Sequence, residues 1–528
     1  MILGGGLLMT RLRLFVQATP VLHYSNWIAA ALVTLFAAYL HVLFFLNAGG
    51  LWRDEVDLVH LSLMPSFSEV WQNLPHDSCP ILMHLVVRAW SEAGFGNTDP
   101  SLRVLGLYVG LFLLLAFWFA SWTLRSGAPL VAVTLAALNV TIICVGDSLR
   151  GYGLGSALAV LTLAVIWRLS CRPSLAAFSW AVAVAILSVH SLYQNAFLLF
   201  AACCGGFVLC AVERRWRDTL PIFAVGAAAA LSLLPYVPLI AGAHWYVIYK
   251  AGYGFSYGWK QLAAAAGSPL TIFTWVWVAV WIGLSAAAIS VFLWRRDRVP
   301  EHVRGLIFFA GTSLLLGAAG YALFLKLAQY PTHPWHYVPL MVFSAVCLDA
   351  MFFTACRWAR PAAIILAALT ISSAVVFDPP ALKCRQTNVD LVAARISSEV
   401  APNDYVIVHP FYCGTTFNRY YKGAAPWTTL PPLEDYTLQR WDLFNAKMQT
   451  KDPFAPVIER ITSTLQSGNR VWFVGNPLVE RSWLPVGDQV TQFLSAHSNL
   501  AAVVIDPSTN CVNPFENLPV FVATGWKP

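Results

Sequence analysis

The feature that most constrains this sequence is a series of about eleven apolar runs, because a helix needs about 20 apolar residues to cross the hydrocarbon core of a membrane. The composition agrees: the 528 residues are 58% hydrophobic and 11% charged, whereas soluble domains carry roughly 25% charged residues. The sequence therefore predicts a mainly α, polytopic transmembrane helical bundle. The runs cover residues 27–47, 103–122, 128–146, 152–169, 174–191, 193–212, 219–242, 269–294, 305–327, 337–356 and 361–377.

Basic residues between the runs set the expected orientation, because cytoplasmic loops of membrane proteins are enriched in Lys and Arg. With the N-terminus in the cytoplasm, the cytoplasmic side receives about fourteen arginines and the opposite short loops receive about seven basic residues. An odd number of crossings then leaves the C-terminus outside. We recognise no cleavable signal peptide. We also recognise no retention signal, which favours a bacterial inner membrane over the endoplasmic reticulum, where the topology would be the same. The formal net charge of +7 reflects this topology and does not indicate a nucleic-acid partner.

The predicted domains are a membrane domain at residues 1–378, with an outer loop at 48–102, and an extracytoplasmic α/β domain at residues 379–528. The tail domain has a helical pattern over 388–400. Strand-like runs, separated by Pro, Gly, Asn and Asp, lie at 404–409, 470–475, 500–505 and 519–523.

Cysteine usage is compatible with this topology. Seven of the eleven cysteines lie in or beside the apolar runs, where Cys is an ordinary small core residue. The other four are on the predicted outer face, where disulfides can form. Four cysteines allow three pairings, and the sequence leaves open which of them, if any, occurs. They are Cys79, Cys384, Cys413 and Cys511.

The strongest motif is the segment 51–55, Leu-Trp-Arg-Asp-Glu, directly after the first apolar run. Two adjacent carboxylates beside a membrane are costly unless they have a function. Asp54 or Glu55 could act as a general base towards a hydroxyl or bind a divalent cation, and Arg53 could bind a phosphate. The alternative is a solvated loop that caps a helix.

A second segment follows at 75–84, Pro-His-Asp-Ser-Cys-Pro-Ile-Leu-Met-His, and then Gly94-Phe95-Gly96 and Ser101-Leu102-Arg103. The order of these elements over about residues 27–210 resembles the GT-C superfamily of membrane glycosyltransferases. The resemblance is to the branch with protein O-mannosyltransferases, lipid A aminoarabinose transferase and core galacturonosyltransferase-like domains. That branch has an Asp-Glu pair in its first outer loop and then a Pro-Pro-Leu-like element, which here contains Cys79-Pro80. The resemblance makes His76 a candidate substrate-binding residue.

The third motif is Gly146-Asp147-Ser148-Leu149-Arg150-Gly151-Tyr152, which resembles the acidic-x-x-Arg-x-Tyr element of the same family. Asp147 would complete a metal site or orient the donor. Arg150 would hold a phosphate through paired hydrogen bonds, with Tyr152 beside it. The alternative is that Asp147 caps the following helix and Arg150 reaches towards the membrane surface.

Two weaker candidates lie further along the chain. Lys250 and Lys260 stand among aromatic residues in the outer loop at 243–268 and are candidates for the donor phosphate. Most of those rings fit an interfacial aromatic belt equally well. His336 and Tyr337 occupy the place where the family often has Arg-Tyr, so a permanent cation is missing there.

The resemblance implies a reaction as well as a fold. A sugar would pass from a polyprenyl-phosphate-linked donor, on the extracytoplasmic side, to a hydroxyl of a glycan, lipid or protein acceptor. Asp54, Glu55 and Asp147 would be catalytic, with Asp54 as the base. Asp54 and Asp147 are candidate ligands of a divalent metal, whose presence the sequence leaves open. A multi-helix transporter and a catalytically inactive membrane scaffold are the alternatives.

Overall fold

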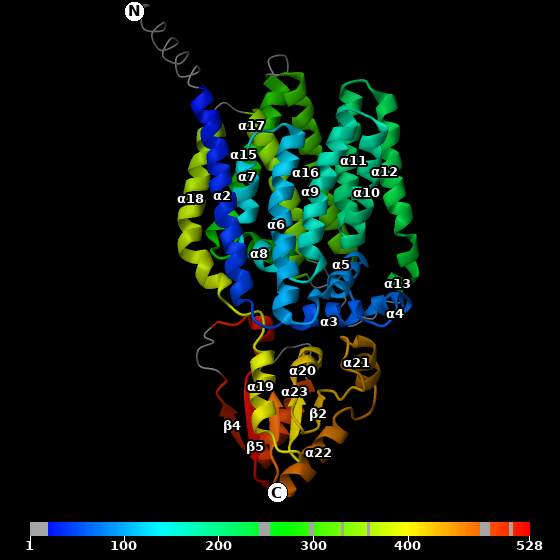
Figure 1. Ribbon diagram of the computed structural model, residues 1–528, viewed down its shortest axis with the longest axis vertical. Helices are drawn as coiled ribbons and strands as arrows, with labels where there is room; N and C mark the ends of the chain where they lie inside the picture. Colours follow the sequence, from blue (N-terminus) through cyan, green and yellow to red (C-terminus); the bar gives the residue numbers. More distant parts are fainter. Residues whose placement is uncertain are drawn as a thin grey trace, which may run out of the picture. The chain divides into compact units, whose positions relative to one another are not determined.

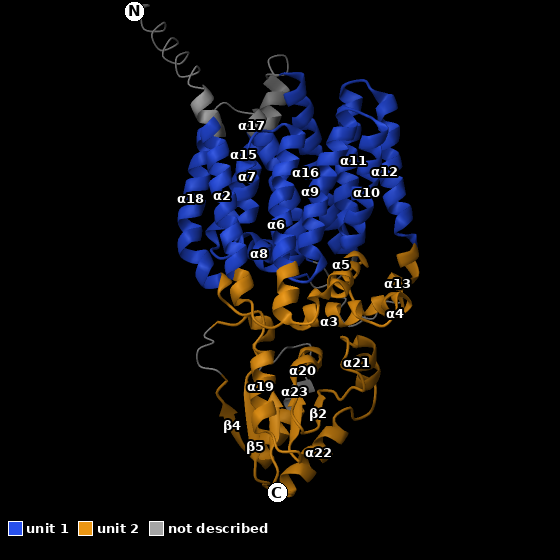
Figure 2. Ribbon diagram, viewed as in Figure 1, with its two compact units in different colours: residues 1–43, 106–234, 251–381 blue, residues 44–105, 235–250, 382–528 orange. Residues whose placement is uncertain are grey.

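The computed structural model of the chain describes residues 19–241, 254–294, 300–328, 332–355, 359–475, 486–505 and 511–528. Figure 1 labels its helices and strands, and Figure 2 colours its two compact units. The first, here called the membrane unit, comprises residues 1–43, 106–234 and 251–381. The second, here called the loop-and-tail unit, comprises residues 44–105, 235–250 and 382–528.

Eight helices among the described residues are long and apolar enough to cross a membrane, judged by length and composition. The chain is therefore a multi-pass membrane protein. The spans lie in α2 (Thr19–Asn47), α6 (Asp99–Leu124), α9 (Gly151–Cys171), α11 (Asn195–Val212), α12 (Thr219–Ser232) together with α13 (Val237–Ala241), α16 (Glu301–Ala328), α17 (Val338–Ala355) and α18 (Ala359–Leu382).

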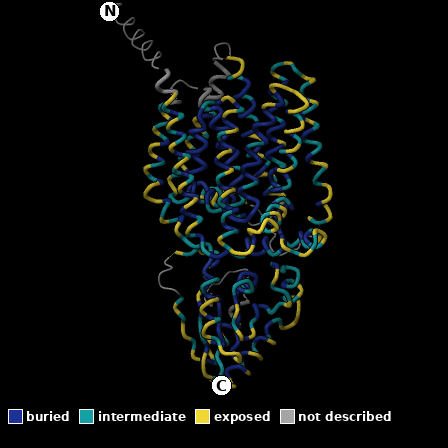
Figure 3. The backbone as a smooth tube through the Cα atoms, in the orientation of Figure 1, coloured by how far each residue is buried: buried dark blue, intermediate teal, exposed yellow. Residues whose placement is uncertain are grey.

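Exposure separates the central helices of the membrane unit from those at its rim. In α9 and α17, 78% of the apolar window is buried, against 33% in α2 and 28% in α18. Figure 3 shows exposed residues recurring along α2 and α18. On α2 they are spaced by three or four positions, so they form one apolar stripe of the kind a lipid-facing helix presents. The stripe contains Tyr24, Ile28, Leu32, Leu35, Tyr39, Val42 and Leu46.

The predicted span at 128–146 is wrong as one continuous helix. The structure divides it into α7 (Leu130–Ala132), the π-helix η3 (Val133–Ala137) and α8 (Val140–Gly146). Asn139 stabilises the break, because its side chain accepts a hydrogen bond from Ile142 N–H at 3.0 Å and donates one to the Ala265 carbonyl at 3.0 Å. Asp349 accepts the N–H of Val131 at 2.9 Å. Side chains thus supply hydrogen bonds to backbone groups that could not form hydrogen bonds with lipid.

Two further predicted spans, 174–191 and 269–294, also correspond to apolar helices. The first is α10 (Leu175–Ser191), which with 17 residues is shorter than the eight long helices. The second is α15 (Ile272–Trp294), which has 23 residues. The remaining predicted runs correspond to the eight long helices of the described residues.

The loop-and-tail unit contains a five-stranded sheet of order β2-β1-β3-β5-β4. β1 (Tyr405–Val408) pairs in parallel with β2 (Trp427–Thr429) and with β3 (Val471–Val474), whereas β5 (Val520–Thr524) is antiparallel to β3 and to β4 (Asn499–Val503). Every residue of β1 and β3 is buried, as expected for continuous apolar strands inside a sheet. The four predicted strands are confirmed. The sequence interpretation missed β2, which has only three residues in a Pro-rich stretch.

Helices complete this unit. The tail contributes α19 (Val389–Glu399), α20 (Gly414–Tyr420), α21 (Trp441–Met448), α22 (Ala455–Gln466) and α23 (Val486–His497). α19 confirms the helix predicted at 388–400. The first outer loop contributes α3 (Arg53–Ser62), α4 (Phe67–Asn73) and α5 (Leu82–Trp90). The compact units thus group the outer loop with the tail, and a domain boundary at residues 378 and 379 stays a prediction.

One disulfide joins Cys384 at the start of the tail to Cys511, shortly before β5. This resolves the pairing that the sequence left open. Cys79 and Cys413 are buried.

Candidate active site

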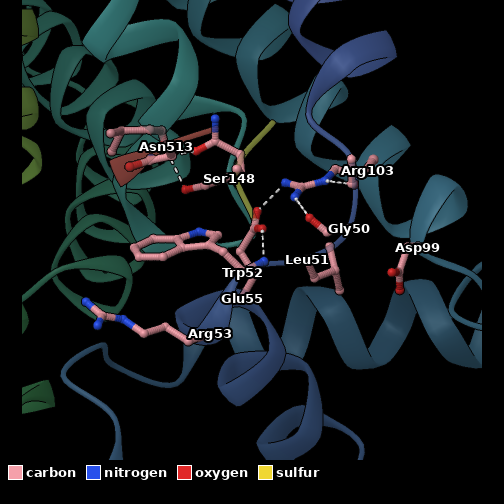
Figure 4. A network of polar contacts seen from close by, with 12 residues as sticks. Gly50, Leu51, Trp52, Arg53, Glu55, Asp99, Arg103, Ser148 and Asn513 are labelled. Carbon is pink, nitrogen blue, oxygen red and sulfur yellow. Dashed lines mark hydrogen bonds and ion pairs between the residues drawn. The ribbon is translucent and has the colours of Figure 1, made fainter. Parts of the chain in front are cut away.

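The loop that carries the Asp-Glu pair is held by Arg103 of α6. Nη1 of Arg103 lies 2.5 Å from Oε1 of Glu55, and Nη2 donates to the carbonyl of Gly50 at 2.7 Å (Figure 4). Both side chains are buried, with 4% of Arg103 and none of Glu55 exposed. The other oxygen of Glu55 accepts the N–H of Trp52 at 3.2 Å and so caps the start of α3. Glu55 therefore shapes the loop.

Two glycines allow this loop to pass close to the tail. Gly49 has φ +72°, a conformation that favours glycine. A Cβ at Gly49 would lie 2.5 Å from Cζ of Arg385, and one at Gly50 would lie 2.9 Å from Cγ of Asp390. Arg385 and Asp390 form an ion pair at this place.

Asp54 differs from its neighbour in exposure and in contacts. Its side chain remains 19% exposed. Oδ1 accepts hydrogen bonds from Nε of Arg53 at 3.2 Å and from Nε2 of Gln439 at 3.0 Å. The carboxylate is thus oriented by two donors and still reachable from solvent, which is the arrangement expected of a general base.

The side chain of Arg53 points away from the carboxylate of Glu55 (Figure 4). Its guanidinium lies 4.5 Å from the ring centroid of Tyr412, and its backbone N–H donates to Oε2 of Glu516 at 3.1 Å. Burial opposes the charge of Arg53 and is the largest single effect, but Asp54, Tyr412, Cys413 and Glu516 together outweigh it, so the pKa of Arg53 is raised. Arg53 stays positive and stands directly beside the partly exposed carboxylate of Asp54.

Glu516 is fully buried and accepts a hydrogen bond from the Thr416 hydroxyl at 2.7 Å. Burial raises the pKa of Glu516 to about 7, although Thr416 and Arg53 oppose the rise. This carboxyl connects η9 (Pro514–Glu516) of the tail to the first residue of α3.

The last turn of α20 provides another attachment of the tail to the loop. Nη2 of Arg419 lies 2.6 Å from Oδ1 of Asp99, and the Tyr420 hydroxyl donates to the same carboxylate. That hydroxyl accepts the N–H of Leu51 at 2.7 Å. Burial and Asp99 raise the pKa of Tyr420. No local sequence pattern pointed to Arg419, Tyr420, Gln439 or Glu516, because their partners are hundreds of residues away in the chain.

In the segment 75–84, His76 lies near the tail and His84 lies in the interior. His76 Nδ1 lies 3.9 Å from Oδ1 of Asp442. Despite its burial, Asp442 has its pKa lowered to about 2 by Arg440, which also pairs with Asp435. His84 is buried against Asp77, with 3.2 Å between Nε2 and Oδ2.

In the membrane unit, Asp147 pairs with a residue that the sequence interpretation did not single out. Nδ1 of His41 on α2 lies 2.7 Å and 2.9 Å from the two carboxylate oxygens of Asp147, and both side chains are 2% exposed. Glycines on α6 make room for them. A Cβ at Gly106 would collide with the carbonyl oxygen of Asp147, and one at Gly110 would collide with its carboxylate.

Some of the remaining candidate residues of the membrane unit lie close together. Arg150 is the buried N-cap residue of α9. Tyr152 and His336 make an edge-to-face ring contact with centroids 6.1 Å apart, and the Tyr337 hydroxyl lies 3.1 Å from that of Thr332. Lys260 is exposed on α14 (Phe255–Ala266). Lys250 lies outside the described residues.

The metal site expected at Asp54 and Asp147 stays a prediction. Among the described residues, no group of three or more His, Cys, Asp or Glu side chains could hold an ion. Asp54 belongs to the loop-and-tail unit and Asp147 to the membrane unit. A divalent metal therefore stays a proposal, and no step of the reaction is assigned to it.

Two solved structures of ArnT from Cupriavidus metallidurans share this fold. The structure with bound undecaprenyl phosphate is 13% identical, with a TM-score of 0.53, and the match covers 93% of this chain and 98% of that chain. The apo structure is 12% identical, with a TM-score of 0.54 and coverage of 94% and 98%. The oligosaccharyltransferase of Archaeoglobus fulgidus is 12% identical, with a TM-score of 0.46 and coverage of 94% and 74%. No protein-family model and no curated protein sequence matches the chain. The GT-C fold that the motifs predicted is confirmed.

Proposed function

We propose that this chain is a membrane glycosyltransferase that moves a sugar from a polyprenyl-phosphate-linked donor to a hydroxyl group on the extracytoplasmic side of the membrane. The fold supports the donor class, because a structure with the same fold was solved with undecaprenyl phosphate bound. The acceptor is a glycan, a lipid or a protein. The site of action is a bacterial inner membrane, with the tail in the periplasm.

The observation that carries the proposal is the contrast between Asp54 and Glu55. Glu55 is fully buried in its pair with Arg103 and has no access to a substrate. Asp54 keeps 19% of its side chain exposed and receives oriented hydrogen bonds from Arg53 and Gln439. Of the two carboxylates, only Asp54 has the access that proton abstraction requires. We assign Asp54 as the catalytic base and Glu55 as the residue that shapes its loop.

The reaction is a single displacement at the anomeric carbon of the donor sugar. Asp54 takes the proton of the acceptor hydroxyl as its oxygen forms a bond to that carbon. The bond from the carbon to the phosphate oxygen breaks, and the polyprenyl phosphate leaves with the electron pair. General-base assistance of this kind is worth about 10²–10⁴ in rate. Holding the two substrates in line supplies much of the remaining acceleration.

The candidate residues of the membrane unit are proposed for the donor. Asp147 orients the donor, and Arg150 and Tyr152 bind its phosphate. Lys250, Lys260, His336 and Tyr337 line the approach of the lipid headgroup. In the loop-and-tail unit, the constant positive charge of Arg53 and the imidazole of His76 favour binding of an anionic substrate group.

The test compares glycolipids and glycans from cells with and without the gene by mass spectrometry, which identifies the product. In the deletion strain, Asp54→Asn should form at least about 10²-fold less product at an unchanged protein level. Glu459→Gln, at an exposed carboxyl on α22, is the matched control and should restore product in full. If the two strains do not differ, the chain is a transporter or an inactive scaffold instead. If Asp54→Asn restores product in full, Asp54 is not the base and the proposed mechanism is rejected.

A further inference from the structure

The tail places one side chain directly on the proposed base. Gln439 lies in the segment between β2 and α21, and its side-chain amide donates to Oδ1 of Asp54 at 3.0 Å. Its backbone N–H donates to Oδ1 of Asp57 at 2.7 Å. Asp57 is one turn further along α3, and 2% of it is exposed. Gln439 is therefore attached to two successive acidic positions on one face of the helix that carries the base.

The conformation of this segment is fixed on both sides of Gln439. The Arg440 guanidinium bridges Asp435 and Asp442, with nitrogen–oxygen distances of 2.7 Å and 2.6 Å. The carbonyl of Thr437 lies 2.8 Å from Nδ1 of His60 on α3. These contacts already fix the backbone of the segment. The hydrogen bond from the Gln439 amide to Asp54 therefore forms without a further cost in backbone conformational entropy.

We infer that Gln439 is a positioning residue of the transfer reaction, supplied by the tail, and that it acts through Asp54. This inference rests on the proposed function. The hydrogen bond fixes Oδ1, so the carboxylate keeps one orientation towards the acceptor hydroxyl. Hydrogen bonds to charged groups are stronger than those between neutral groups, and small displacements of a catalytic group lower the rate strongly.

The inference gives the tail a share in catalysis. The carboxylate comes from the loop between the first two long helices, and the residue that orients it is 385 positions later in the chain. Truncation before Gln439 should therefore lower turnover by at least about tenfold even where the membrane helices are intact.

The experiment uses Gln439→Leu, which keeps the size and the backbone N–H but removes the side-chain donor. Gln449→Leu is the matched control, because Gln449 is an exposed glutamine at the end of the neighbouring helix α21. Transfer is measured with purified full-length protein in detergent, using donor lipid and acceptor extracted from the deletion strain. For Gln439→Leu we expect kcat to fall about tenfold with an unchanged KM for the donor lipid. Gln449→Leu should behave as wild type.

A double-mutant cycle separates positioning from a general loss of folded enzyme. If Gln439 acts through Asp54, adding Gln439→Leu to Asp54→Asn lowers the residual rate no further. An equal loss in both backgrounds would show that the substitution only damages the structure, and would overturn the inference. If Gln439→Leu lowers the amount of folded protein, Gln439→Glu decides, because it keeps the shape and places a like charge beside Asp54. Gln439→Glu should lose at least as much activity.

The outcomes also separate this inference from the proposed function. A large loss for Asp54→Asn with wild-type kcat for Gln439→Leu would reject the role of Gln439 and leave the base intact. Wild-type turnover by Asp54→Asn would reject the proposed mechanism, and the role of Gln439 with it.

Discussion

Glu55 and Arg103 form a buried ion pair with 2.5 Å between nitrogen and oxygen, and this pair fixes the loop that presents Asp54. Removing one partner of a buried pair leaves an uncompensated charge and typically costs 3–5 kcal/mol. We therefore expect Arg103→Met to lower the melting temperature of the purified protein clearly. Glu55→Gln should be milder, because its amide can still accept the N–H of Trp52. The double variant should lose less stability than the sum of the losses of the two single variants, which thermal melting in detergent can check. Additive losses would show that the pair is not coupled.

The second prediction concerns Asp147 and His41. A Cβ at Gly110 would collide with the Asp147 carboxylate and lie 2.5 Å from Nδ1 of His41. We expect Gly110→Ala to displace the pair and to lower transfer by at least about tenfold, if Asp147 orients the donor. Gly283→Ala is the control, since a Cβ at this helical glycine of α15 meets nothing within 4 Å. Full activity of Gly110→Ala would place Asp147 outside the catalytic apparatus.

The third prediction is a pH dependence of stability from Glu516. Burial raises its pKa from the model-peptide value of 4.5 to about 7 in the folded protein. The folded state therefore binds more protons than the unfolded state between about pH 4.5 and pH 7, so stability falls as the pH rises through this window. The shift corresponds to about 3 kcal/mol at most. Glu516→Gln removes this titration.

The melting temperature of Glu516→Gln should consequently exceed that of wild type at about pH 8, and the advantage should vanish towards pH 4. Scanning calorimetry of both proteins over this range measures the difference, and the other titrating groups cancel in the comparison. A constant difference at all pH values would show that Glu516 is not buried as a neutral acid.

The fourth prediction concerns orientation. The arginine distribution predicts that residues 48–102 and the tail lie outside. Cysteines introduced at the exposed positions Glu92 and Glu459 should react with a membrane-impermeant maleimide in intact cells. The native Cys171, exposed at the end of α9, should react only after permeabilisation. The reverse pattern at any of these positions would reject the topology.

The sequence allowed the elements to be predicted where the signal is local. Long apolar runs identified the eight long helices, and buried runs such as 405–408 and 471–474 identified strands, because burial on both faces requires continuous apolar residues. The span at 128–146 failed because its break depends on Asn139 and Asp349, whose hydrogen bonds to distant groups leave no local pattern. Hydropathy also does not distinguish a continuous helix from three short ones.

The candidate site was predictable only in part, for the same reason. The motif at 51–55 pointed to two carboxylates. The identities of neighbouring residues, however, do not reveal that the Glu55 side chain is buried against Arg103 while the Asp54 side chain is partly exposed. Gln439 and Tyr420 carry no motif of their own. Their importance arises from contacts with Asp54 and Leu51 that only the folded chain creates.

The distance of 385 residues between Asp54 and Gln439 has a consequence for biosynthesis. Ribosomes add about 5–20 residues per second, so the loop with the base leaves the ribosome tens of seconds before the segment that orients it. Throughout that interval the nascent chain carries an incompletely arranged base. Chains released before Gln439 by a premature stop codon would insert into the bilayer without the residue that orients the base, so unfinished copies would consume donor lipid at least about tenfold more slowly.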